Sequence, residues 1–308
     1  KQEKARPQGA AMRVLPPLLY GEGHAYAIPF SGTGNETSIA SLTRDDLVGY
    51  HRDWVRPDNA TLVVVGDTTL AEITPLLEKH LGDWTSAGTG SSNVAIAPVA
   101  LPKAPRVYLI DQPGAVQANL YVGQVMPSSK DPDAIKLEFA NSVLGGEFSS
   151  RLNMNLREDK HWAYGASSGL VATAGAGPFI VSAPVQSDKT AESMKEIMKE
   201  LQDVLTSRPR EEKEIHFARD SLVLGLPGSN ETAGEVAGSY AAIITYGLPD
   251  TYWNDYIGEV NALTPAQLQS AAQKLVRPEA LTWVIVGDLA KIEDGIRKLN
   301  LGEVKVLD

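Results

Sequence analysis

Cysteine is absent from the 308 residues of the chain, which excludes disulfide bonds, thiolate metal ligands and cysteine nucleophiles. Positive charge is also scarce, since 28 lysines and arginines stand against 38 aspartates and glutamates, and the formal net charge is −10. The sequence has no Lys/Arg-rich block that would neutralise a phosphate backbone. We therefore expect no nucleic-acid partner.

Long apolar runs are missing as well. No stretch approaches the roughly 20 apolar residues that span a bilayer, so we expect no membrane span. The N-terminus, Lys1-Gln2-Glu3-Lys4, lacks the apolar core of a secretory signal, although such a signal could already have been removed. An acidic chain without cysteine fits a bacterial periplasm, which is the compartment that we expect, but it fits the cytoplasm too.

Paired histidines are a third absence. The five histidines are isolated from one another: His24, His51, His80, His161 and His216. Neither H-E-x-x-H nor H-x-x-E-H occurs, so no two imidazoles share a helix face at the spacing of a catalytic zinc site. We therefore predict no metal site in this chain and no catalysis by the chain alone. His24, among turn formers, is interpreted as a loop residue packed between Tyr20 and Tyr26.

Two distant segments of the sequence resemble each other. They are LTRDDLVGYHRDWVRPDNATLVVVGD, beginning at Leu42, and LTPAQLQSAAQKLVRPEALTWVIVGD, beginning at Leu263. The threonines differ by 264 − 43 = 221 positions, and the aspartates that end the segments differ by 288 − 67 = 221 positions. A constant offset indicates a repeated structural unit without insertions over this stretch.

Each copy predicts a helix followed by a buried strand. In the second copy Thr264 suits the N-cap, Pro265 the first helical position and Gln267 a capping box, and in the first copy Thr43 and Asp46 take the equivalent places. The Arg-Pro pair then ends the helix. The β-branched runs at 62–65 and 281–286 predict buried strands that stop at Gly-Asp.

A segment poor in charge lies between the copies. Residues 85–105, TSAGTGSSNVAIAPVALPKAP, are rich in small residues and proline and indicate an interdomain linker. The linker divides the chain into a first domain, 1–84, and a second domain, 106–308. At the same offset the first domain would begin near 106 − 221 = −115, so we expect 1–84 to be the C-terminal part of a domain truncated at its N-terminus, and the chain to be a fragment of a longer one.

The second domain has the pattern of an α+β fold. Strands are predicted over 107–111 and 116–125. A pair of strands is predicted around 166–184, where the small residues of TAGAG allow a tight turn between the two. Helices are predicted over 133–144, 150–159, 211–224, 232–246 and 251–260. Another helix carries an apolar stripe, interpreted as core: Met194, Ile197, Met198, Leu201, Val204 and Leu205. We expect a sheet covered on one face by helices.

Arg157 and Tyr164 are the residues with the clearest chemical potential. They are seven residues apart, or two helical turns, so they would share a helix face or converge if Tyr164 lies just past the helix end. A guanidinium and a phenol together offer directed donors to a carbonyl oxygen. The alternative is structural, with Arg157 in a solvated last turn and Tyr164 anchoring a strand end.

The stretch LGGEFSSRLNMNLREDKHWAYGASS, together with the 221-residue repeat and the segment from Tyr246-Gly247 to the final VIVGD, resembles the pitrilysin/insulinase family of inverted-zincin metallopeptidases. The resemblance is to the inactive half that accompanies a zinc-bearing half. It implies two homologous insulinase-type domains, each a mixed sheet covered by helices. It also implies that Arg157 and Tyr164 bind the substrate backbone near the scissile bond.

The resemblance implies further partners and limits. Zinc is expected in a partner subunit or in a missing N-terminal domain, since LEFANSVLGG offers no ligands where the active domain carries its zinc motif. Glu3 falls near the place of a third zinc ligand, although a surface charge is the alternative. His161 and Trp162 depart from the family pattern, which usually has a glycine and a smaller apolar residue there, and they would reshape the wall beside Tyr164.

The function expected from the resemblance is that of a substrate-holding half of a zinc-dependent peptidase, paired with a zinc-motif-bearing half and acting on oligopeptides. Two alternatives remain open. One is a non-catalytic core subunit of a larger complex, and the other is a peptide-binding protein without a catalytic partner.

Overall fold

The computed structural model describes residues 2–85, 95–206, 208 and 211–307. The chain divides into two units, of which the first comprises residues 1–33, 97–225 and 250–308 and the second comprises 34–96 and 226–249. Residues 86–94 of the expected linker lie outside the described residues. The division into two homologous domains at 84 and 106 stays a prediction.

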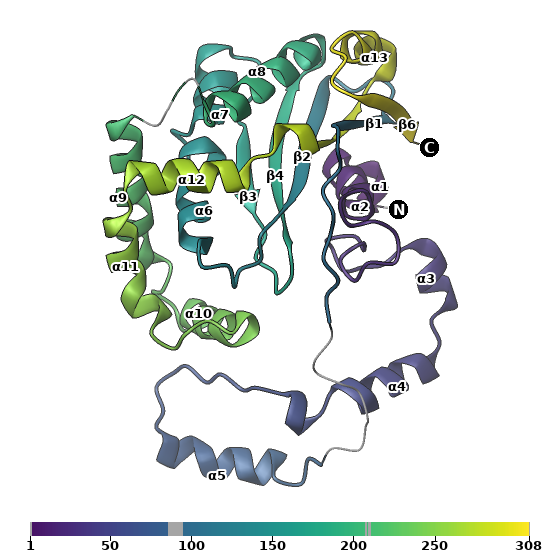
Figure 1. Cartoon of the computed structure of the whole chain (residues 1–308). Coiled ribbons are helices and arrows are strands. Elements are labelled where there is room, and N and C mark those ends of the chain that lie inside the picture. The colour runs from purple at the N-terminus through teal and green to yellow at the C-terminus, as the bar shows by residue number, and fades with distance from the viewer. Residues whose placement is uncertain (1, 86–94, 207, 209–210, 308) are drawn as a thin grey trace. The chain divides into compact units, whose positions relative to one another are not determined.

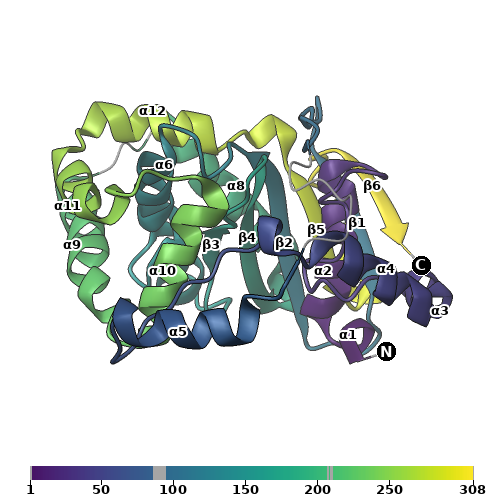
Figure 2. The same cartoon turned by 90° about the horizontal axis from the view of Figure 1, so that it is seen from below.

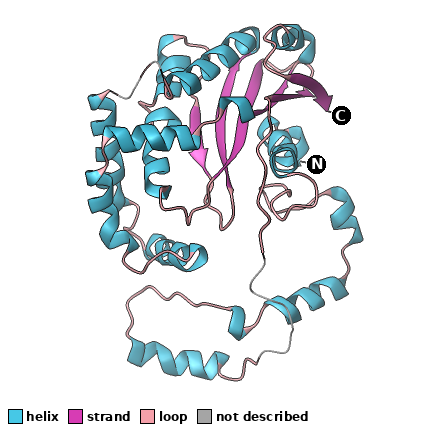
Figure 3. Ribbon diagram, in the orientation of Figure 1, coloured by secondary structure: helices cyan, strands magenta, loops and turns pink. Residues whose placement is uncertain are grey.

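The first unit is built on one six-stranded sheet (Figures 1 and 3). Its strand order is β3-β4-β2-β5-β1-β6. In chain order the strands are β1 (Arg106–Asp111), β2 (Gln117–Met126), β3 (Ser167–Leu170), β4 (Gly177–Gln186), β5 (Thr282–Gly287) and β6 (Glu303–Leu307). β2 pairs antiparallel with β4 and β5, β3 pairs antiparallel with β4, and β1 lies parallel between β5 and β6. The sheet is therefore mixed, as expected.

The two predicted copies of the repeated strand have different outcomes. Every residue of β5 is buried, because β5 pairs on both sides and its alternate side chains pack into clusters on both faces of the sheet, and the prediction for 281–286 is confirmed. The prediction for 62–65 is wrong, since these residues form no strand, and Leu62 and Val64 are 59% and 46% exposed. None of the described strands pairs with this segment, and a β-branched run becomes a strand only where neighbouring strands satisfy its backbone.

Helices cover one face of the sheet and bury the main core against it. The apolar side of α8 (Thr190–Asp203) is buried as expected, with Met194, Ile197 and Leu201 fully inside. The other helices that contribute to this core are α6 (Ala134–Asn141), α7 (Arg151–Asn153), α12 (Pro265–Leu275) and α13 (Leu289–Arg297). Two more helices are α9 (Glu212–Gly228) and α11 (Tyr252–Ala262), of which α11 contacts α6.

The second face of the sheet also carries a helix, which corrects the expectation of a single covered face. α1 (Gln2–Ala5) leads into α2 (Pro7–Tyr20), which lies beside β2 and β5 (Figure 2). Ala11, Leu15 and Leu19 of α2 belong to one buried cluster with residues of these strands. Arg106 ties the helix end to the sheet, since its guanidinium donates to the carbonyl of Leu18 at 2.7 Å. β5 is apolar at successive positions, so both of its faces need a cover.

The second unit is helical in its described residues. It contains α3 (Glu36–Ser41), α4 (Arg44–Trp54), α5 (Leu70–Leu81) and α10 (Ala233–Tyr246). The expected capping box of Thr43 and Asp46 begins α4, and its counterpart in the first unit, Thr264 with Gln267, begins α12. No helix among the described residues is long and apolar enough to cross a membrane.

Candidate functional site

Arg157 lies on a widened helical turn. α7 continues into a π-helical turn over Met154–Asp159, a feature that is frequent at functional sites. Leu152 and Leu156 on this segment are fully buried in the main core, so the backbone that carries Arg157 is anchored from below. The carbonyl of Arg157 also meets a ring nitrogen of His161 at 3.0 Å.

Tyr164 follows the end of this segment and stands in solvent. Its neighbour Ala163 forms a β-bridge with Val185 of β4, and Val185 points into the main core. Because successive side chains of an extended segment point to opposite sides, Tyr164 projects away from that core. The side chain of Tyr164 is 85% exposed. This is the second of the two predicted arrangements, in which Tyr164 lies past the helix end and converges on Arg157.

The structure brings Arg157 and Tyr164 together and adds a third residue. The guanidinium carbon of Arg157 lies 5.4 Å from the ring centroid of Tyr164 and 4.5 Å from that of Phe148. Both distances are within the range of cation–π attraction. Glu158 approaches the same guanidinium at 3.4 Å and partly balances its charge. An arginine held against two exposed rings can present its N–H groups, beside a phenol, to a carbonyl oxygen.

Phe148 was missed by the sequence reasoning. It stands nine residues before Arg157, on the connection between the π-helical turn Ser142–Gly146 and α7, where no periodic pattern links it to the pair. One feature of the sequence could have pointed to Phe148. It is the single aromatic residue in GGEFSS, where its neighbours along the chain are small or polar.

A buried ion pair and buried hydrogen bonds hold the segment that carries Arg157. The Arg151 side chain, which is 2% exposed, donates through Nε and one terminal nitrogen to the Glu214 carboxylate at 2.7 Å each. Although burial alone would raise it, the hydrogen bond from Arg151 holds the pKa of Glu214 below its ordinary value. Asn155 donates to Glu196 and Glu200 of α8. The bonds of Arg151 fix α7 to α9, and those of Asn155 fix the π-helical turn to α8, so the segment that carries Arg157 is held at both elements.

The carboxylate of Glu3 is hydrogen-bonded to Arg13 and Thr33. It accepts from Arg13 at 2.9 Å and from Thr33 at 3.1 Å, and the hydrogen bond from Arg13 lowers the pKa of Glu3. His24, the other N-terminal residue considered, stacks on Tyr20 and meets Tyr26 edge-on, as predicted.

The described residues do not fit a zinc ion. They contain no group of three or more histidine, aspartate or glutamate side chains that could hold a metal. Both polar groups of the Asn141 side chain on α6 are already hydrogen-bonded to Ser168. The amide of Asn141 donates to the Ser168 carbonyl, and the amide oxygen accepts from the Ser168 hydroxyl at 2.7 Å. No chemical step can therefore be assigned to a metal held by these residues.

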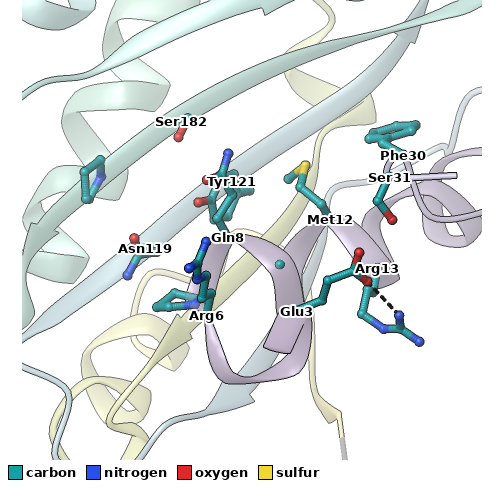
Figure 4. Close-up of a pocket in the computed structure, with 13 residues that line it drawn as sticks. Glu3, Arg6, Gln8, Met12, Arg13, Phe30, Ser31, Asn119, Tyr121 and Ser182 are labelled. Carbon is teal, nitrogen blue, oxygen red and sulfur yellow. Dashed lines mark hydrogen bonds and ion pairs between the residues drawn. The ribbon is translucent and has the colours of Figure 1, made fainter. Parts of the chain in front are cut away.

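A groove of about 800 Å³ opens between α2 and the sheet (Figure 4). Arg6, which directly precedes α2, and Gln8 of α2 line it on one side, and Asn119 and Ser182 line it from β2 and β4. The Glu3–Arg13 ion pair borders the opposite side. Pro184, which also lines the groove, directly precedes Val185, the bridge partner of Ala163, so groove and Tyr164 lie on the same side of β4.

Known proteins match the chain over most of its length. The family described as peptidase M16 inactive domain matches residues 41–222. An uncharacterized zinc protease of Mycobacterium leprae is 25% identical over 278 residues, which cover 88% of this chain and 60% of that protein. An uncharacterized zinc protease of Bacillus subtilis is 25% identical over 279 residues, which cover 89% and 64%. The chain thus spans somewhat less than two thirds of the relatives that it matches.

Solved structures share the fold. A peptidase M16 inactive domain from Pseudomonas fluorescens superposes with a TM-score of 0.82 at 23% identity, over 93% of this chain and 67% of that one. A chain of Complex III2 from Candida albicans superposes with a TM-score of 0.77 at 12% identity, over 97% and 72%. At these identities the likeness shows the architecture alone.

Proposed function

The chain belongs to the family of peptidase M16 inactive domains, and from this membership we propose that it is the substrate-holding, non-catalytic half of a zinc-dependent peptidase. In this proposal Arg157 and Tyr164 bind the backbone of an oligopeptide, and zinc is carried by another domain or subunit. The observation that carries the proposal is the convergence of the Arg157 guanidinium and the exposed Tyr164 ring at 5.4 Å on a rigid base.

The role of the pair follows from its donors. Arg157 offers several N–H groups in a planar fork and Tyr164 one O–H, and all of them suit carbonyl oxygens. Where these donors meet the carbonyl under attack, they stabilise the negative charge that develops on its oxygen. Where they meet a neighbouring carbonyl, they fix the register of the peptide. Either way this half contributes orientation and hydrogen bonds, and the other half contributes the chemistry.

The first prediction concerns turnover in the assembled enzyme. Arg157→Ala should lower kcat/KM for a quenched fluorescent oligopeptide by about 100-fold to 1,000-fold, because a donor to the reacting oxygen is lost. Tyr164→Phe keeps the ring and should cost about tenfold. The assay uses this chain with its zinc-motif-bearing half, and the chain alone as the reference for inactivity.

A matched control removes the same charge elsewhere. The Arg44 side chain is 86% exposed on α4, so Arg44→Ala should leave turnover unchanged. Wild-type turnover by the Arg157→Ala enzyme would show that the pair does not hold the substrate and would favour a scaffold role. Binding of a labelled peptide, dependent on Arg157 but without cleavage in any assembly, would identify a peptide-binding protein instead. Cleavage by the chain alone would overturn the non-catalytic assignment.

A further inference from the structure

Phe148 is a large apolar residue that lies mostly in solvent. Its side chain is 64% exposed, and it lies on Arg157 rather than in the core. Its neighbours Glu147 and Ser149 line a cavity of about 290 Å³ that also contains Val143 and Phe217, and Phe148 is not part of this lining. A large apolar side chain gains free energy when it leaves water. The ring therefore faces solvent and Arg157, not the cavity beside it, which is lined by polar and charged side chains as well as by Val143 and Phe217.

Asn153 is hydrogen-bonded to the backbone of Phe148 and also to the backbone of Ala166, two residues after Tyr164. Asn153 is 5% exposed, and its side-chain amide donates to the Phe148 carbonyl at 2.6 Å. The amide oxygen of Asn153 accepts from the backbone N–H of Ala166 at 3.1 Å. One buried side chain thus sets the spacing between the two connections that carry Phe148 and Tyr164.

Two exposed aromatic rings with a cation against both of them make a surface that prefers apolar side chains. The Arg157 guanidinium lies over both rings, and Phe148 and Tyr164 are still 64% and 85% exposed, so part of each ring is open to a ligand. Aromatic side chains attract one another beyond the area that they bury, and they also attract aliphatic side chains through that area. A small or strongly hydrated side chain gains neither contribution.

We propose that Phe148 is a specificity-determining residue, which together with Tyr164 forms an aromatic clamp around Arg157 that binds an apolar, preferably aromatic, side chain of the peptide. The inference rests on the proposed substrate-holding function. In this arrangement the backbone is held by the donors of Arg157 and Tyr164, and the adjacent side chain is held by the rings. The clamp selects among peptides, whereas the donors act on all of them.

The test compares matched peptides in the assembled enzyme. A set of quenched fluorescent peptides carries a single phenylalanine at successive positions of an otherwise alanine and serine sequence, with the all-alanine peptide as reference. The wild type should prefer phenylalanine at one position. Phe148→Leu should reduce that preference about threefold to tenfold, mainly through KM, and Phe148→Tyr should keep it. Tyr50→Leu, which changes a ring that is 63% exposed on α4, should leave it intact.

The outcomes separate the two proposals. The preference is the kcat/KM for the phenylalanine peptide divided by the kcat/KM for the all-alanine peptide. If this ratio is the same in wild type and in Phe148→Leu, the clamp is overturned. If Phe148→Leu lowers kcat/KM equally for all peptides, Phe148 serves only to hold Arg157. If no assembly cleaves peptide, the same ratio is measured as binding of labelled phenylalanine and alanine peptides to the intact chain. A preference that depends on Phe148 there supports the clamp although the peptidase role has failed. Binding without preference overturns the clamp.

Discussion

Gly145 allows the segment of the site to approach the sheet. A Cβ atom at this position would lie 2.5 Å from the backbone nitrogen of Ser168 in β3 and 2.8 Å from Leu152. Contacts of this kind are not found between real side chains, and the neighbour is backbone, which cannot turn aside. The π-helical turn Ser142–Gly146 therefore touches β3 directly, and the connection bearing Phe148 starts from this contact.

We predict that Gly145→Ala lowers the free energy of unfolding by about 2 kcal/mol or more, because it overpacks a contact with backbone. Gly169→Ala is the matched control on β3, where an added Cβ would meet nothing within 4 Å, and it should change the free energy by less than about 0.5 kcal/mol. Urea unfolding followed by tryptophan fluorescence measures both. Equal effects would mean that the approach at Gly145 can relax.

At the residue scale the sequence predicted the pair but not the third member of the site. The seven-residue spacing of Arg157 and Tyr164 left two arrangements open, and the β-bridge at Ala163 decided between them. Phe148 comes from before a bend, so its contact with Arg157 depends on how two connections fold together. His161, where the family usually has glycine, has a φ of 57°, which is the conformation that favours glycine.

At the scale of elements, α6 and α11 meet through a carboxyl group. The hydroxyl of Tyr256 on α11 donates to the carboxylate of Glu138 on α6 at 3.1 Å. Burial raises the pKa of Glu138, against the opposing effect of this hydrogen bond. Burial and the nearby Glu138 charge also raise the pKa of Tyr252 to about 12. Burial, which outweighs the hydrogen bond from Tyr256, therefore favours the protonated, neutral form of Glu138.

We predict that Glu138→Gln makes the protein relatively more stable as the pH rises. A carboxyl whose pKa is raised by folding costs stability once the pH passes its unfolded value, near 4.5, and the cost grows until the pH reaches the folded value. Each unit of the shift corresponds to about 1.4 kcal/mol. The glutamine keeps an acceptor for Tyr256. Urea unfolding between pH 4 and pH 8 should show the variant gaining on the wild type, and a constant difference would contradict this.

Element boundaries followed the sequence where caps and periodicity were strong, and departed from it elsewhere. The helix expected over 133–144 ends as an α-helix at Asn141 and widens into a π-helical turn, because the following glycines let the chain press against β3. Two final elements, α13 and β6, were not predicted. Leu289, Ile292 and Ile296 have helical spacing and are buried, so the signal for α13 was present, whereas β6 depends on the edge that β1 offers it.

At the scale of the whole molecule, a helix from before the expected linker completes the sheet of the expected second domain. Leu15 of α2 is fully buried, and Tyr121 and Val284, from β2 and β5, belong to the same cluster. The hydrogen bond from the Tyr20 hydroxyl to the Ala176 carbonyl at 2.9 Å adds a second tie. Residues 1–33 thus form one unit with the sheet.

We predict that Leu15→Ala lowers the free energy of unfolding of this unit by about 2–5 kcal/mol, because it leaves a cavity between helix and sheet. Leu70→Ala is the control, since Leu70 is 83% exposed on α5, and it should change stability by less than about 0.5 kcal/mol. Chemical unfolding followed by tryptophan fluorescence compares them, because Trp283 on β5 is fully buried. A small effect of Leu15→Ala would show that α2 is not part of the cooperative unit.

The sequence by itself determined the features that depend on local spacing and on residue type: the repeated helix with its caps, the apolar strand that became β5, the face of α8, and the presence of Arg157 and Tyr164 in one short segment. Only the tertiary structure decided that 62–65 forms no strand, that α2 covers the second face, and that Phe148 joins Arg157. The reason is physical. A helix satisfies its backbone within one segment, whereas strand pairing, the cover of a sheet and contacts between connections depend on partners that are distant along the chain.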